Sequence, residues 1–218
     1  MICPGCSSNL LHNHMLIDDS VPPMKNRSEI IYPQCSVCGH AIQVPDIEEN
    51  ISVFRKVLLI SGTAGAGKSA LGQLIASQSD YIFVDGDAIS KRVNYYARLD
   101  PGASVPDYQR ETIRTMLVLL GLGYDVVVGY VINREVWLWY REELAKYHLS
   151  PVFRVLVPDR SVCLQRDLNR ECWTAGAEYV DRWYDEQREY LLTDPEICID
   201  SSRETLADTF ARHFMDLL

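Results

Sequence analysis

Gly62-Thr63-Ala64-Gly65-Ala66-Gly67-Lys68-Ser69 matches G-x-x-x-x-G-K-[ST], the pattern of a phosphate-binding loop. The apolar run at 57–60 predicts a buried strand before this loop, and the apolar spacing over 69–77 predicts a helix after it. Glycines lack the Cβ that would stop backbone N–H groups from turning toward an anion, and a helix N-terminus adds partial positive charge. We therefore expect the loop to hold ATP, with Lys68 reaching the β- and γ-phosphates and Ser69 ligating Mg²⁺.

The chain beyond this loop alternates between predicted strands and predicted helices. Further strands are predicted at 81–84, 125–132, 152–157 and 197–199. Further helices are predicted at 107–122, 135–147 and 203–217, and two more between 160 and 190. Alternation of this kind predicts an α/β fold with a parallel sheet and ligands beyond the carboxyl ends of its strands. Residues 51–218 are thus expected to form a three-layer P-loop NTPase domain with a five-stranded parallel sheet.

Composition narrows the class of protein. The 218 residues carry a net charge of −9, which argues against a broadly nucleic-acid-binding surface. No apolar run approaches the ~18 residues of a transmembrane helix, and the first residues do not resemble a signal peptide. Seven cysteines, four of them in two C-x-x-C pairs, favour a reducing compartment and a bound metal over disulfides. We expect a cytoplasmic protein.

The two C-x-x-C pairs predict a separate small domain over residues 1–50. Cys3, Cys6, Cys35 and Cys38 can supply the four thiolates of a tetrahedral zinc site, as in zinc ribbons. A redox pair is the alternative, but redox C-x-x-C pairs begin a helix in a βαβ setting, which is absent here. A segment of about 50 residues cannot bury much surface, so we expect zinc to stabilise its fold. The segment carries two basic and six acidic residues, so we expect its surface to contact a protein rather than nucleic acid.

Two carboxylates follow the second predicted strand. Asp85 and Asp87 come at the edge of the sheet where the phosphate-binding loop lies. Phosphoryl transfer to a hydroxyl needs a carboxylate that accepts its proton, and hydrated Mg²⁺ needs acidic partners. Two acids one residue apart on an extended segment are expected to point in similar directions. A solvated acidic turn is the alternative interpretation.

Arginines and tyrosines complete the candidate site. Arg166 and Arg170 are spaced i, i+4, so one helix face would present both guanidinium groups to phosphate oxygens. Salt bridges with neighbouring acids on the surface are the alternative. Arg92, Tyr108 and Arg110 lie between the second strand and the next helix, where an acceptor pocket commonly forms in this architecture, and Tyr130 is a further candidate for its lining.

These features together resemble the small P-loop kinases over residues 57–210. The resemblance rests on the loop at 62–69, Val84-Asp85-Gly86-Asp87, the run 124–128, the two arginines and Ile199-Asp200-Ser201-Ser202. The pattern is similar to adenylylsulfate kinase, gluconate kinase, chloramphenicol phosphotransferase and the kinase part of polynucleotide kinases.

The resemblance implies residue roles. Asp87 would be the catalytic base and Asp85 its neighbour, Arg166 and Arg170 would belong to a lid, and the backbone at Ser201 and Ser202 would cradle the adenine of ATP. Residues 88–92, which follow Asp87, match neither the adenylylsulfate kinase nor the gluconate kinase pattern, so the resemblance leaves the acceptor open.

The leading interpretation is an ATP- and Mg²⁺-dependent kinase that phosphorylates a hydroxyl of a small molecule: a nucleoside or nucleotide, a sugar, or an antibiotic-like compound. Three alternatives stay open. A polynucleotide 5′-hydroxyl kinase would bind oligonucleotides in a salt-sensitive manner. A nucleotide-dependent switch or scaffold ATPase would hydrolyse ATP slowly without any acceptor. A toxin-like kinase of sugar nucleotides would arrest growth when expressed.

Overall fold

The computed structural model describes residue 51 and residues 55–91, 108–170 and 174–218. The predicted zinc ribbon at 1–50, with Cys3, Cys6, Cys35 and Cys38, lies outside the described residues, and so does Arg92.

Five parallel strands form the centre of this domain. They are β1 (Val57–Gly62), β2 (Tyr81–Asp85), β3 (Asp125–Gly129), β4 (Val152–Leu156) and β5 (Cys198–Ile199). Their order across the sheet is β2-β3-β1-β4-β5, and every pairing is parallel. All six residues of the central strand β1 are buried, as expected for a parallel sheet covered on both faces. The predicted five-stranded parallel sheet is confirmed.

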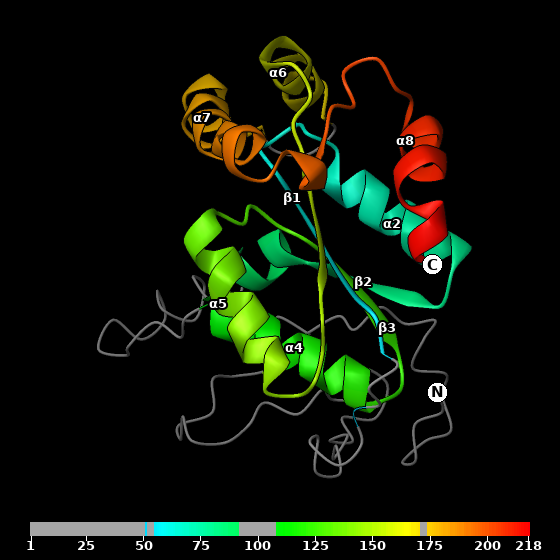
Figure 1. Ribbon diagram of the computed structural model, residues 1–218. Coiled ribbons are helices and arrows are strands. Elements are labelled where there is room, and N and C mark those ends of the chain that lie inside the picture. The colour runs from blue at the N-terminus through cyan, green and yellow to red at the C-terminus, as the bar shows by residue number, and fades with distance from the viewer. Residues whose placement is uncertain (1–50, 52–54, 92–107, 171–173) are drawn as a thin grey trace. The chain divides into compact units, whose positions relative to one another are not determined.

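Helices cover both faces of the sheet. They are α2 (Lys68–Gln78), α4 (Tyr108–Gly121), α5 (Arg134–Ala145), α6 (Arg160–Leu168), α7 (Ala177–Thr193) and α8 (Leu206–His213), with short 3₁₀ turns η1 (Pro195–Ile197) and η2 (Met215–Leu217). Figure 1 shows α2 and α8 on one side of the sheet, α4 and α5 on the other, and α6 and α7 near the end of the sheet where β1 leads into α2. The fold is therefore three-layered, as predicted.

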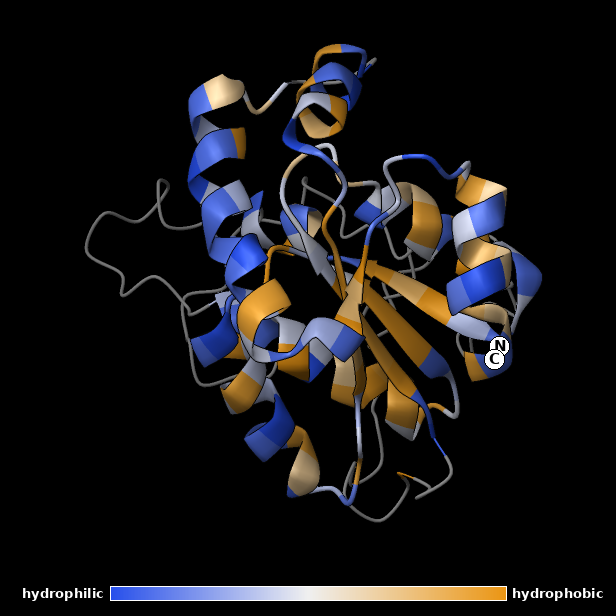
Figure 2. Cartoon of the chain, turned by 45° about the horizontal axis from the view of Figure 1, so that its top comes forward, coloured by the Kyte–Doolittle hydropathy of each residue, from blue (hydrophilic) through white to orange (hydrophobic). Residues whose placement is uncertain are grey.

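The core lies where these layers meet. Leu58 and Ile60 of β1, Leu71 and Ile75 of α2, and Phe214 after α8 belong to one buried cluster. Figure 2 shows apolar strands between helices whose polar residues lie mostly on the outside. Burial of this apolar surface stabilises the sheet and fixes the direction in which the strands end.

Aromatic residues of α5 pack against the sheet. The Trp137 ring stacks on Phe153 of β4 with 4.5 Å between ring centroids, and Tyr140 is fully buried. These aromatic side chains therefore serve in packing α5 against the sheet.

Two local expectations were wrong. Residues 86–91 form a helix directly after β2, so Asp87 does not lie on an extended segment. Helix α6 ends at Leu168 with Asn169 as its C-cap, so Arg170 follows the helix instead of sharing a face with Arg166. No helix within the described ranges is both long and apolar enough to cross a membrane.

Candidate functional site

The phosphate-binding loop is built tightly against neighbouring backbone. Gly62, Gly65 and Gly67 adopt φ of +144°, +77° and +105°, which side-chain-bearing residues rarely adopt. A Cβ on Gly65 would lie 2.0 Å from the carbonyl oxygen of Cys163 in α6, so this position admits only glycine. Gly67 is the N-cap of α2, and the loop therefore ends at a helix N-terminus that favours anions.

Lys68 lies inside the loop that it completes. Its side chain is 6% exposed, and Nζ donates a hydrogen bond to the carbonyl oxygen of Thr63 at 2.9 Å. Burial lowers the pKa of Lys68 to about 8, and the negative charge of Asp87 opposes that shift. An anion bound beside this buried amine would therefore stabilise its charged form. Ser69, the predicted Mg²⁺ ligand, is the second residue of α2 and half-buried.

Asp85 and Asp87 have different roles because the chain turns into a helix between them. Asp85 ends β2, and its Oδ1 accepts a hydrogen bond from the backbone N–H of Asp87 at 3.0 Å. Burial, followed by the charge of Asp87, raises the pKa of Asp85. Asp85 therefore fixes the start of the helix at 86–91, and this helix positions Asp87. Both carboxylates lie near enough to Lys68 for their charges to oppose the lowering of its pKa by burial.

Asp87 lies at the meeting point of two sets of residues. It is half-buried. Its negative charge opposes the lowering of the Lys68 pKa by burial, and it adds to the rise that burial causes in the pKa of Tyr130 and of Tyr179. A carboxylate near both the phosphate-binding loop and tyrosine hydroxyls has a placement suited to a proton acceptor.

Arg166 links the loop to the end of β5. Its guanidinium donates hydrogen bonds to the carbonyl oxygens of Ala66, at 3.5 Å, and of Ser201, at 3.2 Å. Arg166 thus contacts both segments that are predicted to bind the nucleotide. Among the described residues it forms no salt bridge, which was the alternative interpretation.

Arg170 pairs with a buried acid. Its Nε lies 3.4 Å from Oδ1 of Asp167, so the salt-bridge alternative does hold for this arginine. Burial is the main cause of the lowered pKa of Lys68, and the positive charge of Arg170 adds to it. The two arginines therefore reach the same site by different routes: one from within α6 and one from the segment that follows it.

Asp167 is a site residue that the sequence analysis missed. It is 1% exposed, and Oδ2 accepts hydrogen bonds from the backbone N–H groups of Ala175 at 2.9 Å and Gly176 at 3.1 Å. The buried carboxylate thus joins the end of α6 to the start of α7 and holds Arg170. Gly176 before an amphipathic helix was the available signal, because a helix start recruits acidic partners.

Helix α7 is attached to the phosphate-binding loop. The Thr63 hydroxyl donates a hydrogen bond to the carbonyl oxygen of Val180 at 3.0 Å. Further along α7, the buried Gln187 side chain bonds the Ser61 hydroxyl at 2.7 Å and the carbonyl oxygen of Ile132 at 3.1 Å. These buried contacts fix the distance between α7 and the ends of β1 and β3.

The predicted adenine cradle follows β5. Ser202 Oγ accepts a hydrogen bond from the backbone N–H of Asp159 at 2.7 Å and donates to Asp200. Ser201 is 4% exposed, and its hydroxyl has no hydrogen-bond partner among the described residues. A buried polar atom without a partner costs free energy, so a ligand that supplied one would stabilise this segment.

Tyrosine rings lie near the helix that carries Asp87. Tyr108, at the start of α4, meets Tyr130 edge to face with 5.6 Å between ring centroids. Arg110 is exposed two residues further along α4. Tyr179, which the sequence analysis did not select, has a pKa that burial raises, and the charge of Asp87 adds to that shift.

No protein-family model matches the chain, and no curated protein matches it. Solved structures do. A gluconokinase from Sinorhizobium meliloti 1021 aligns with a TM-score of 0.52 at 21% identity, over 71% of this chain and 86% of that one. A chain from a structure of the Pnkp1/Rnl/Hen1 RNA repair complex aligns with a TM-score of 0.51 at 14% identity, over 67% of this chain and 48% of that one. At these identities the likeness establishes the fold.

Proposed function

We propose that this protein is an ATP- and Mg²⁺-dependent phosphotransferase that acts on a hydroxyl of a small molecule. The observation that carries the proposal is the position of Asp87 in the helix that directly follows β2: its carboxylate interacts electrostatically with the buried Lys68 of the phosphate-binding loop, and the Tyr130 ring packs against the neighbouring Gly86. A switch ATPase would need no such carboxylate between the loop and a second site. The similarity in fold to a gluconokinase agrees with the proposal.

The residues of the chain divide the work between binding, positioning and proton transfer. The amides of residues 62–69 and the Lys68 amine would hold the phosphates, and Ser69 would ligate Mg²⁺, whose charge neutralises that of the phosphates. Arg166 and Arg170 would stabilise the negative charge on the transferred group. The acceptor hydroxyl would give its proton to Asp87 as its oxygen bonds to the γ-phosphorus and the bond to the β-phosphate oxygen breaks.

Acceptor-dependent ATP turnover tests this function. The panel holds nucleosides, nucleotides, sugars, antibiotic-like alcohols and a 5′-hydroxyl oligonucleotide, with Lys68→Ala as the control for the loop. The proposal expects one class to raise ADP formation manyfold and to appear as a phosphorylated product. Slow hydrolysis that no acceptor stimulates, together with tight ATP binding, would favour the switch alternative instead.

We further propose that residues 1–50 bind one Zn²⁺ through Cys3, Cys6, Cys35 and Cys38. Four thiolates in two C-x-x-C pairs support this assignment. Metal analysis of purified protein should find one zinc per chain, and a Cys35→Ser, Cys38→Ser variant should lose it. Retention of zinc by this variant would contradict the assignment.

The acidic composition of residues 1–50 favours a protein as the partner of this segment.

A further inference from the structure

Two tyrosine rings lie beside Asp87 on the sheet side of the site. The Tyr130 ring packs against the backbone between the two acids, because a Cβ on Gly86 would lie 2.4 Å from its Cδ2. The Tyr108 ring meets Tyr130 at an interplanar angle of 69°. The chain after β3, the start of α4 and the helix at 86–91 thus bring two rings to the carboxylate.

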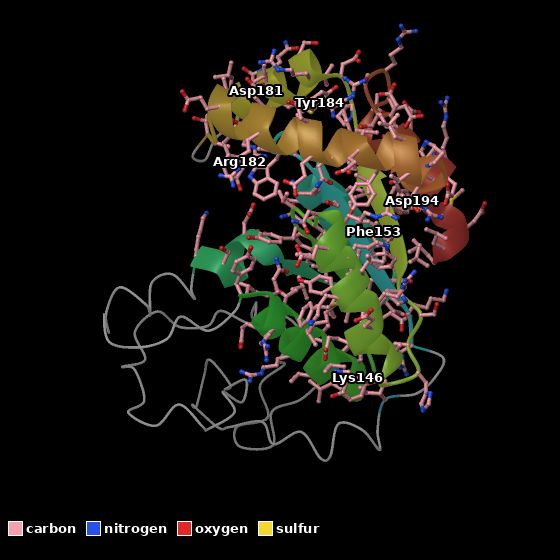
Figure 3. The ribbon with its side chains drawn as sticks, turned by 60° about the vertical axis from the view of Figure 1, so that its left-hand side comes forward. Lys146, Phe153, Asp181, Arg182, Tyr184 and Asp194 are labelled. Atoms are coloured by element: carbon pink, nitrogen blue, oxygen red, sulfur yellow. The ribbon has the colours of Figure 1, made fainter. Side chains whose placement is uncertain are left out.

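Helix α7 supplies a second pair of rings. Tyr179 and Trp183 lie one helical turn apart with 6.1 Å between ring centroids. The Arg182 guanidinium lies 5.4 Å from the Trp183 ring centroid, at a distance suited to a cation–π contact. Figure 3 shows Arg182 on the opposite side of α7 from Asp181, which pairs with Arg160 of α6.

The first turn of α7, which carries Tyr179, lies at the phosphate-binding loop, because the Thr63 hydroxyl donates a hydrogen bond to the carbonyl oxygen of Val180 at 3.0 Å. Burial raises the pKa of Tyr179 and the charge of Asp87 adds to this shift, which agrees with a position of Tyr179 near the carboxylate. Tyr108 is 36% exposed and Tyr179 is 41% exposed, so both keep ring surface open to a ligand.

We propose that the acceptor carries a flat aromatic or heteroaromatic ring beside the hydroxyl that is phosphorylated, and that Tyr108, Tyr130 and Tyr179 hold this ring next to Asp87. The inference rests on the proposed function and names its substrate class. Aromatic faces bind flat rings by stacking and edge contacts. An open-chain polyol would instead need several hydrogen-bonding side chains to replace its water, whereas Tyr108 and Tyr130 bring aromatic rings to the start of the helix that carries Asp87.

Direct binding is the test, because it does not depend on turnover. Protein with Mg²⁺ and a non-hydrolysable ATP analogue is titrated with adenosine, uridine and an aromatic alcohol, and separately with gluconate and N-acetylglucosamine. At least one of the three aromatic probes should bind about tenfold or more tightly than gluconate and N-acetylglucosamine. Loss of one stacking ring in Tyr179→Leu should weaken that binding by roughly 5- to 150-fold. Tyr179→Phe keeps the ring and should retain most of the affinity. Leu192→Ala, at an 86% exposed position of the same helix, is the matched control.

The outcomes separate this inference from the function on which it rests. Binding and phosphorylation of a polyol alone would overturn the ring inference and leave the phosphotransferase proposal standing. Ring binding that Tyr179→Leu abolishes, without transfer to any bound probe, would support the ring site and overturn the proposed function. Equal binding of the ring-bearing probe to wild type and Tyr179→Leu would overturn the inference, as would binding of no probe at all.

Discussion

Replacing Asp167 by alanine should destabilise the domain more than the loss of any exposed acid of α6 or α7. Its carboxylate is 1% exposed and accepts two backbone hydrogen bonds, from Ala175 and Gly176, with Oδ2. Its Oδ1 is buried without a hydrogen bond among the described residues and lies at ion-pair distance from Arg170. The substitution therefore leaves two backbone donors and one guanidinium without their acceptor.

The magnitude follows from these contacts. Each orphaned donor costs about 1–3 kcal/mol when fully buried, and Ala175 and Gly176 are only half-buried, so the low end applies to each. Arg170 is itself partly exposed, so its lost ion pair adds little after screening by water. A loss of about 2–4 kcal/mol is expected. At about 2–4 °C per kcal/mol for a domain of this size, Tm should fall by roughly 5–15 °C.

Thermal and urea unfolding measure this loss. Asp167→Asn keeps an acceptor of the same shape without the charge and should fall between wild type and Asp167→Ala. Asp181→Ala is the matched control, because Asp181 forms an ion pair with Arg160 at 2.5 Å between the same two helices but at an exposed position. The control should unfold close to wild type. If Asp167→Ala were as stable as the control, the buried carboxylate would not hold the start of α7, and this account of the α6–α7 connection would be refuted.

Three further substitutions or conditions probe the site. Because burial lowers the pKa of Lys68 to about 8 and bound phosphates favour its charged form, the Kd for ATP should rise about tenfold between pH 7 and 9. Calorimetry should show proton uptake when ATP binds at the higher pH. A Kd for ATP that stays constant between pH 7 and 9 would contradict this role of Lys68. Gly86→Ala would push the Tyr130 ring away, so KM for the acceptor should rise while KM for ATP stays unchanged; an equal rise in both would argue against a separate acceptor site. Gly65→Ala should cost about 1–3 kcal/mol more in urea unfolding than Gly67→Ala, since both have positive φ but only Gly65 faces backbone at 2.0 Å; the reverse order would contradict the tight packing of the loop.

The sequence predicted the sheet and the loop because their signals are local. An apolar, β-branched run such as Val126-Val127-Val128 is typical of a buried strand. The glycine spacing of the loop is typical of a backbone that binds phosphate. The helix at 86–91 was missed because Asp85-Gly86-Asp87 has the composition of a turn. The extra length assigned to β3 came from Tyr130-Val131-Ile132, which is apolar but leaves the sheet.

Site residues whose role depends on distant chain were not predictable in the same way. Asp167 has its role only because the chain returns at Ala175 and Gly176. Tyr179 and Trp183 have the spacing of an amphipathic helix, which packing residues share. Asp87 was selected because the carboxyl ends of parallel strands meet at one edge of the sheet, and its role as the base came from the resemblance to small P-loop kinases.

Acceptor-dependent phosphoryl transfer by wild type and Asp87→Asn, measured beside the Kd for ATP, is the most direct test of the central claim. If Asp87 accepts the proton of the hydroxyl, the variant should bind ATP nearly as wild type does and lose about 10²- to 10⁴-fold in kcat with the best acceptor. Full turnover by Asp87→Asn with that acceptor would contradict the assignment of Asp87 as the base and, with it, the proposed organisation of this site.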